Sequence, residues 1–275
     1  MLITAGKWPF LDHSFMLYTR RYLQRSFHAI HLLGDAPQIA DDGHTPLLVC
    51  LNHSSWWDVM MGYFVERELF NWEYYAVMDA RQLQRYKFFA HLGVIGVDRT
   101  SLAGAKEFVR YGTDLLQGKR RSLWVTPQGR MVSNQTRPMT FQPGLSHLAA
   151  GLSSFYLARV AFHYEFWNER LPEAFVSVSP IEHFQRTDVK FDRKGFLQTQ
   201  ELALQTQVET LLAAVQVRDA TAFHPLLQGR VGISPTYDAL RAFGARLRGQ
   251  SFSPEHGDLV TPQWKQKTPT IKKEE

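Results

Sequence analysis

Short apolar runs alternate with longer stretches of helical periodicity along most of this sequence. Four runs rich in β-branched and aromatic residues predict buried strands, over residues 47–51, 73–78, 94–97 and 121–125. Helical periodicity between these runs predicts helices that open at residue 58 and cover residues 81–92 and 102–117. The alternation predicts an α/β fold with a mixed, largely parallel sheet flanked by helices.

The helix over residues 102–117 carries the clearest signals. Thr100 or Ser101 can cap its first turn, and Gly118 follows its last turn as a terminator. Its apolar residues fall on one face, which holds Ala105, Val109, Gly112 and Leu116.

The second half of the chain continues the pattern after a long polar loop over residues 127–143. This loop is rich in Pro, Gly, Asn and Gln, and its length indicates a function beyond connection. The elements predicted after it are helices over 144–151, 198–216 and 237–247, and strands over 156–165 and 174–181. The composition of residues 250–275 predicts a disordered tail.

An amphipathic helical pattern marks the N-terminal segment, residues 1–36. Basic and aromatic residues flank one apolar stripe, which contains Met16, Leu23, Phe27 and Ile30. A helix of this kind either lies in a membrane interface or packs across the main domain, and the stripe fits both interpretations. No apolar run in it approaches the roughly 20 residues that a membrane-spanning helix needs. We predict a membrane-associating helix here, followed by a main domain over residues 37–249.

Composition and charge narrow the set of partners. The 275 residues carry a net charge of +5, which favours anionic partners such as a membrane surface, phosphate groups or an acidic carrier protein. No nucleic-acid recognition motif is present, so nucleic acid is not predicted as a partner. The single cysteine, Cys50, lies in an apolar run and is interpreted as a buried hydrophobic residue. One cysteine and no apparent signal peptide indicate a reducing, cytoplasmic setting.

The candidate chemistry begins where the first of these strands ends. Asn52 and His53 follow the run 47–51, and Asp58 comes five residues after His53. An imidazole has a pKa near neutrality, and a carboxylate can fix its tautomer, so the pair suits acid–base chemistry. A spacing of five separates two residues on a continuous helix, so a turn must lie between them, with Asp58 in the first turn of the next helix.

Two further blocks follow in order. Gly93 to Arg99 places an arginine between a strand and a helix N-terminus, where an anion can bind. Taken in isolation, this block is better explained by a surface pair of Arg99 with Asp98. The third block is Thr126-Pro127-Gln128-Gly129, with Phe141-Gln142-Pro143-Gly144 downstream at the start of a helix.

Together the blocks resemble those of the glycerolipid acyltransferase superfamily, which includes the lysophosphatidic acid acyltransferases. Asn52, His53, Ser55 and Asp58 match its Asn-His-x-Ser-x-x-Asp pattern, and the likeness extends from Leu47 to Gly144. The resemblance implies transfer of a fatty acyl group from acyl-CoA or acyl carrier protein to a hydroxyl of a lysophospholipid or related amphiphilic alcohol. It implies His53 as general base oriented by Asp58. It further implies substrate binding by Asn52, Ser55, Arg99, Gln128, Gly129, Arg130 and Arg137. No cluster of His, Cys, Asp and Glu in the sequence has metal-ligand spacing, so no metal is predicted, and no cofactor is expected besides the acyl donor.

The third block departs from the family pattern. Thr126 replaces the usual Phe and Gln128 the usual Glu, while Arg130 follows the glycine with no intervening Thr. Arg130 and Arg137 both compete for the role of the motif arginine. Because Gln128 carries no charge, the acceptor remains open between a glycerol phosphate, a sugar hydroxyl and the alcohol of another lipid or pigment.

Several alternatives accompany this hypothesis. Backbone amides around Gly129 are candidates for an oxyanion site, and Ser54 or Ser55 as an acyl carrier is the alternative to direct attack. His147 and His163 fall on apparent core elements and are interpreted as structural. The predicted partners are a lipid acceptor and the cytoplasmic face of a membrane, bound peripherally. A catalytically silent lipid-binding or scaffolding protein on the same fold is the competing function.

Overall fold

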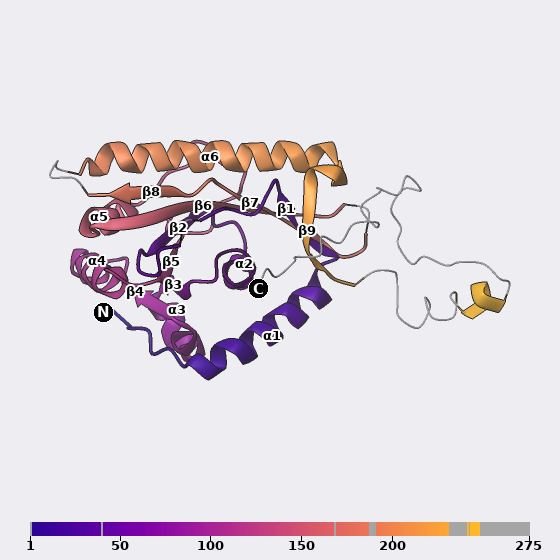
Figure 1. The fold of residues 1–275 in the computed structure, drawn as a ribbon, viewed down its shortest axis with the longest axis horizontal. Helices are drawn as coiled ribbons and strands as arrows, with labels where there is room; N and C mark the ends of the chain where they lie inside the picture. Colours follow the sequence, from indigo (N-terminus) through magenta and orange to yellow (C-terminus); the bar gives the residue numbers. More distant parts are fainter. Residues whose placement is uncertain are drawn as a thin grey trace.

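One mixed sheet forms the centre of the molecule (Figure 1). The structure is a computed structural model that describes residues 2–39, 41–167, 169–186, 191–230, 241 and 243–247. Within these residues the strands follow the order β4-β3-β5-β2-β6-β7-β1-β9, and β8 pairs with β6. Their bounds are β1 (Ala29–Leu33), β2 (Leu47–Leu51), β3 (Glu73–Asp79), β4 (Val94–Val97), β5 (Arg121–Val125), β6 (Ser154–Glu165), β7 (Glu173–Val178), β8 (Glu182–Gln185) and β9 (Phe223–Gln228).

The strands that carry the sequence motifs run parallel to one another. β2 lies between β5 and β6, and β3 lies between β4 and β5, all in parallel register. β7, β8 and β9 add the antiparallel pairs. The predicted mixed, largely parallel sheet is confirmed, and its geometry brings the carboxyl ends of β2, β3, β4 and β5 to one edge.

Helices cover both faces of the sheet. Their bounds are α1 (Pro9–Ser26), α2 (Asp58–Val65), α3 (Ala80–Arg85), α4 (Leu102–Leu116), α5 (Gly144–Gly151) and α6 (Arg193–Val217), with 3-10 turns η2 (Lys87–Leu92) and η3 (Ala220–Ala222). α1 and α2 pack on one face, while α4, α5 and α6 pack on the other. β2 is buried throughout because Val49 faces the first core and Leu48 and Cys50 face the second.

The N-terminal helix is shorter than its pattern predicts. α1 ends at Ser26, and Ala29–Leu33 forms β1, which pairs with β7 and β9. Ile30 therefore belongs to the sheet, and the prediction that it continues the helical stripe is wrong. Two strands satisfy the backbone of this segment from both sides, which a periodic pattern of side chains does not reveal.

The last predicted elements lie largely outside the described residues. This applies to most of the helix predicted over 237–247 and to the whole tail predicted over 250–275. Besides β1, the strands β8 and β9 were not predicted. β8 alternates exposed and half-buried residues, and β9 contains Pro225, so neither shows a buried apolar run.

The buried face of α4 is turned by one residue from the predicted face. Gly104, Phe108, Gly112 and Leu116 are buried, and the Ser101 hydroxyl caps the helix by accepting from the Gly104 N–H at 3.0 Å. Ala105 is exposed and Val109 is half-buried. Half of the predicted face therefore turns away from the core, and both residues line a cavity.

Glu66 is a completely buried carboxyl group at the start of the π-helical turn η1 (Glu66–Phe70), which continues α2. Its oxygens accept hydrogen bonds from the Trp72 backbone N–H and the Trp124 indole N–H, each at 2.7 Å. Burial raises the pKa of Glu66 to about 7, although these donors oppose the rise by stabilising the carboxylate. The fold therefore holds this group partly protonated near neutral pH.

The raised pKa of Glu66 predicts that the free energy of unfolding contributed by this residue falls as the pH rises. Because its pKa is higher in the folded chain than in the unfolded chain, its contribution is complete below pH ~4.5 and is lost as the pH rises through about 7. The shift corresponds to roughly 3 kcal/mol. The wild type should lose this amount relative to Glu66→Gln between those pH values in urea unfolding. A difference between the two proteins that is constant with pH would contradict the prediction.

Candidate active site

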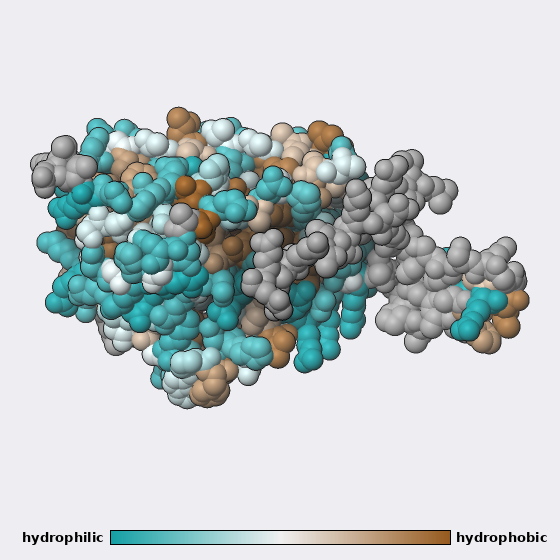
Figure 2. Space-filling model, in the orientation of Figure 1, coloured by the Kyte–Doolittle hydropathy of each residue, from teal (hydrophilic) through white to brown (hydrophobic). Residues whose placement is uncertain are grey.

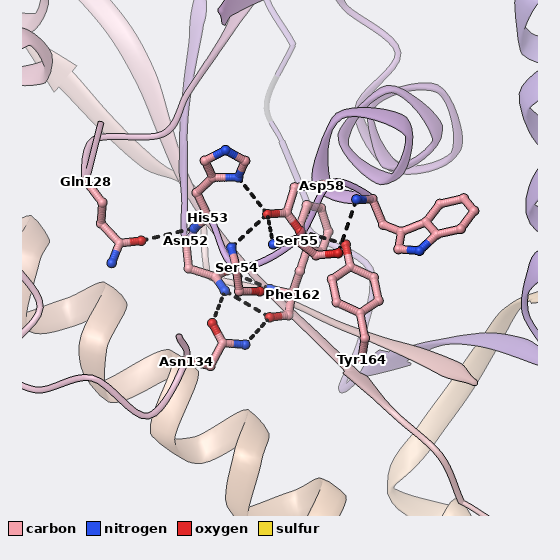
Figure 3. Close-up of polar contacts among 10 residues, drawn as sticks. Asn52, His53, Ser54, Ser55, Asp58, Gln128, Asn134, Phe162 and Tyr164 are labelled. Atoms are coloured by element: carbon pink, nitrogen blue, oxygen red, sulfur yellow. Dashed lines mark hydrogen bonds and ion pairs between the residues drawn. The ribbon is translucent and has the colours of Figure 1, made fainter. Parts of the chain in front are cut away.

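His53 and Asp58 meet at the carboxyl end of β2 (Figure 3). β2 ends at Leu51, a turn follows, and Asp58 occupies the first turn of α2. The turn brings His53 Nδ1 within 2.8 Å of Asp58 Oδ2. The predicted strand–turn–helix arrangement is therefore present, and it closes the five-residue gap between the two side chains.

Four donors hold the Asp58 carboxylate, which is 3% exposed. Oδ2 accepts from His53 Nδ1 and from the backbone N–H groups of Ser54 (2.8 Å) and Ser55 (2.9 Å). Oδ1 accepts from the Tyr164 hydroxyl at 2.7 Å. Burial and the neighbouring Asp58 raise the pKa of Tyr164 well above its usual value, so Tyr164 remains a donor.

The contact with Asp58 fixes the tautomer of His53. A carboxylate can only accept hydrogen bonds, so Nδ1 carries the proton and Nε2 keeps its lone pair. Nε2 points away from Asp58 in Figure 3, and His53 lines a large cavity. Its side chain is 17% exposed, so the ring is reachable while its inner edge is held.

The backbone of His53 is anchored by the polar loop. Gln128 Oε1 accepts from the His53 N–H at 3.0 Å, and the His53 carbonyl accepts from the Val132 N–H at 2.7 Å. Asn52 is held next to it, because its amide donates to Asn134 Oδ1 (2.7 Å) and accepts from the Phe162 N–H (2.8 Å). Asn52 and Ser55 lie outside the cavity lining, so both support the turn from behind.

The cavity has a volume of about 1510 Å³ and opens where the parallel strands end. It is larger than the ~300–1,000 Å³ of most small-molecule sites. One part lies beside α2 and has an apolar wall that includes Met60, Tyr74, Ala76, Val94 and Trp124. The other part lies between α4, α5 and the polar loop and carries the basic residues Arg99, Lys106, Arg110 and Arg130. His53 lines the same cavity as both parts.

The competing arginines separate in three dimensions. Arg99 lines the cavity and pairs with Asp79 (3.2 Å), whereas Asp98 accepts from Thr100 and Ser101 at the start of α4. Arg130 lines the cavity, is exposed, and has no ion pair with any described residue. Arg137 donates to Glu209 and to the backbone carbonyls of residues 134 and 136, and its side chain is not part of the cavity lining. Arg137 therefore connects the polar loop to α6.

Gly129 supplies a close approach rather than a free amide. Its φ of +70° favours glycine, and its N–H already donates to the Thr126 carbonyl at 2.9 Å. A Cβ added there would lie 3.6 Å from Arg99 Nη1 and 3.2 Å from Gln142 Cγ. The Gly129 amide is thus not available to an oxyanion. Of the backbone amides around Gly129 that were predicted as an oxyanion site, those of the neighbouring residues remain candidates.

The comparisons with known proteins agree with this architecture. The acyltransferase family model matches residues 24–162, just over half of the chain. The chain belongs to the acyltransferase family. The solved structure of the 1-acyl-sn-glycerophosphate (LPA) acyltransferase PlsC from Thermotoga maritima matches with a TM-score of 0.50 and 12% identity, over 74% of this chain and 81% of that one. At this identity the likeness shows a shared fold. A search of curated proteins found no match.

The family assignment confirms the prediction that the chain is an enzyme, and it confirms the resemblance seen in the sequence motifs. Two residues of the candidate site were not predicted. Tyr164 and Asn134 lie 106 and 82 residues from Asp58 and Asn52, their respective partners, so no local spacing connects them. Only the position of β6 beside β2 brings the Tyr164 hydroxyl to the carboxylate.

Other side chains of the acyltransferase divide between confirmed and corrected predictions. Cys50 is buried, and burial raises the pKa of its thiol to about 12, which excludes an ordinary role as a nucleophile. His163 is half-buried between Asn134 and Glu165. His147 is exposed, lines the cavity and contacts Arg193 at 3.0 Å, so it does not lie in the core as its position on α5 indicated.

Two further searches covered the described part of the acyltransferase. None of its helices combines the length and the apolar character needed to cross a bilayer. No group of three or more His, Cys, Asp or Glu side chains within that part has the geometry of a metal site.

Proposed function

We propose that this acyltransferase moves a fatty acyl group from a thioester donor to the hydroxyl of a lysophospholipid or a similar phosphate-bearing amphiphile, with His53 as general base. The observation that carries the proposal is the buried contact of His53 Nδ1 with Asp58, which leaves Nε2 free toward the cavity. General base catalysis of this kind contributes about 10²- to 10⁴-fold to a rate.

The reaction needs no protein nucleophile. His53 Nε2 takes the proton of the acceptor hydroxyl while its oxygen attacks the thioester carbonyl carbon. The C–O bond forms, the C–S bond breaks, and the imidazolium returns the proton to the leaving thiolate. Asp58 keeps the imidazole oriented and stabilises its transient positive charge. Ser54 and Ser55 lie outside the cavity lining, which favours direct attack over a seryl intermediate.

Two cations in the cavity that His53 lines support a phosphate-bearing acceptor. Arg99 and Arg130 line the cavity, and a guanidinium binds phosphate through paired N–H groups. Gln128 does not argue against this acceptor, because its amide oxygen receives the His53 N–H. An amide oxygen makes that contact as a carboxylate would, so the exchange of Glu for Gln leaves the backbone anchor intact.

The apolar part of the cavity suits the fatty chain. Its walls come from α2, β3, β4 and β5 and include the uncharged residues Met60, Gly62, Tyr74, Val94 and Trp124. Burying a chain there removes apolar surface from water at about 25 cal/mol per Å². The part of the cavity that carries the basic residues then remains for the polar groups of the two substrates.

An exposed aromatic and basic surface on α1 and η2 supports peripheral attachment to the cytoplasmic face of an anionic membrane. Hydrophobic side chains appear along the lower edge of the molecule, where α1 runs (Figure 2). Phe10 is 71% exposed, and Arg21 and Arg25 form no ion pair with described residues. Neighbouring rings 5.3–5.9 Å apart continue toward the cavity, in the order Phe88, Phe15, Tyr18, Tyr22, Trp57 and Trp56.

Sedimentation with phosphatidylglycerol vesicles tests this surface. Phe10→Ser with Phe88→Ser should weaken binding roughly tenfold, because two exposed rings no longer enter the interface. Leu202→Ser on α6 is the matched control, since Leu202 is 65% exposed and lies on the opposite face of the sheet. Equal vesicle binding by both variants and the wild type would rule out α1 and η2 as the membrane surface.

The function itself is tested with purified full-length protein and detergent-dispersed substrates. Palmitoyl-CoA is offered together with lysophosphatidate or with the corresponding monoacylglycerol, and products are identified by mass spectrometry. Formation of phosphatidate at a rate well above that of diacylglycerol is expected, because Arg99 and Arg130 line the same cavity as His53. Binding of these lipids without any release of CoA would favour a silent lipid-binding protein instead.

A further inference from the structure

Residues of α4 and α5 line a groove that belongs to the charged part of the cavity. It is defined by cavity-lining residues of the two helices, namely Leu102, Ala105, Lys106, Val109, Arg110, Leu145, His147 and Leu148. The acceptor phosphate proposed above uses Arg99 and Arg130, which precede α4 or lie on the polar loop. The α4–α5 groove therefore has no assigned ligand.

Two basic side chains stand together in this groove. Lys106 and Arg110 are one helical turn apart, so their Cβ atoms are about 5–6 Å from each other. Both are exposed, and neither forms an ion pair with any described residue. Like charges at this spacing disfavour a helix, and a bound anion would remove the repulsion.

The acidic groups of the cavity do not neutralise this pair. Asp58 is held by His53 and three other donors, and Asp79 pairs with Arg99. These are the two acidic residues in the described cavity lining. The groove is therefore electropositive, and it selects for a negatively charged ligand.

The shape of the groove restricts that ligand further. α4 rises about 12 Å between Leu102, near the catalytic end, and Arg110. The wall between them contains Ala105 and Val109, with the buried Leu145 and Leu148 from α5. A long, mostly neutral arm with a phosphate at its far end fits a channel of this kind.

We infer that the α4–α5 groove binds the 4′-phosphopantetheine arm of the thioester donor, with Lys106 and Arg110 on its phosphate. The inference rests on the proposed function, in which the donor thioester must reach His53. CoA and acyl carrier protein both present this arm, so the groove recognises the chemistry that the two donors share. Arg99 and Arg130 remain with the acceptor, which gives the cavity two separate anion subsites.

CoA itself is the probe for a binding experiment that does not depend on turnover. Titration calorimetry with the full chain carrying His53→Ala should give a dissociation constant at least about tenfold higher once Lys106→Ala and Arg110→Ala are added. Ala105→Trp, which fills the groove without changing its charge, should weaken CoA binding as well. Lys194→Ala on α6 is the control, because Lys194 is exposed and lies outside the cavity lining.

Steady-state kinetics with variants that retain His53 separate the effects on the two substrates. The Lys106→Ala, Arg110→Ala variant should raise KM for the thioester donor about tenfold or more, with KM for lysophosphatidate unchanged. An effect on acyl-CoA identifies the nucleotide donor, and an effect on acyl carrier protein alone identifies the carrier. An effect on lysophosphatidate alone, or on neither substrate, overturns the inference. Absence of any transfer by the wild type would refute the proposed function and leave the CoA titration readable.

Discussion

Replacement of His53 by Ala is expected to lower kcat for acyl transfer by about 10²- to 10⁴-fold while the fold is retained. The imidazole is the group beside the cavity whose free Nε2 can take a proton from an alcohol, and Asp58 already fixes its tautomer. The His53 side chain is 17% exposed, so its loss also removes packing, and the unfolding midpoint reports that part of the effect separately from the rate. Rates are measured as CoA release, and the fold is followed by circular dichroism and the unfolding midpoint.

A matched histidine separates chemistry from surface effects. His44 is exposed at the opposite end of β2, where it contacts Asp42, and His44→Ala should keep the wild-type rate. The KM for the acceptor should change less than kcat in His53→Ala, because the proton transfer belongs to the transition state. A His53→Ala protein that transfers acyl groups at the wild-type rate would end the proposal that His53 is the base.

Asp58→Asn should reduce kcat by a similar factor, about 10²- to 10⁴-fold, for a different reason. Four donors converge on the two carboxylate oxygens of Asp58, whereas an amide offers one oxygen and two additional N–H groups. An amide N–H directed at His53 Nδ1 makes that nitrogen an acceptor and moves the ring proton to Nε2, where the base is needed. Unpaired backbone donors should also lower the free energy of unfolding by about 1–3 kcal/mol.

Tyr164→Phe provides a graded version of the same test. It keeps the carboxylate but removes the 2.7 Å hydrogen bond to Oδ1, so kcat should fall by about tenfold or less. Without the Tyr164 hydrogen bond, the negative charge of Asp58 is less stabilised by other donors and interacts more strongly with the protonated His53 ring. The acid limb of the kcat/KM profile should therefore move to higher pH. Tyr22→Phe is the control, since Tyr22 contacts Trp57 through its ring and is half-buried. A lower rate with an unmoved pH profile would assign Tyr164 a packing role only.

The sequence by itself determined the elements that contain their own signals. Buried parallel strands such as β2 are covered on both faces, so they read as continuous apolar runs, and α4 carries its cap and terminator locally. The turn between His53 and Asp58 also followed from spacing alone, because two residues five positions apart do not lie on the same face of a helix. The ordered motif blocks were sufficient to indicate the acyltransferase family.

Contacts between distant segments were decided only by the tertiary structure. β1 and β9 gain their backbone partners from each other and from β7, and β1 therefore replaced the last turns of a predicted helix. Arg130 lines the cavity whereas Arg137 does not, a difference that depends on the path of the loop, and the donor Tyr164 arrives from β6. The periodicity of a segment reflects which of its residues face water and which face the core. It contains no information about hydrogen-bond partners that lie far away in the chain.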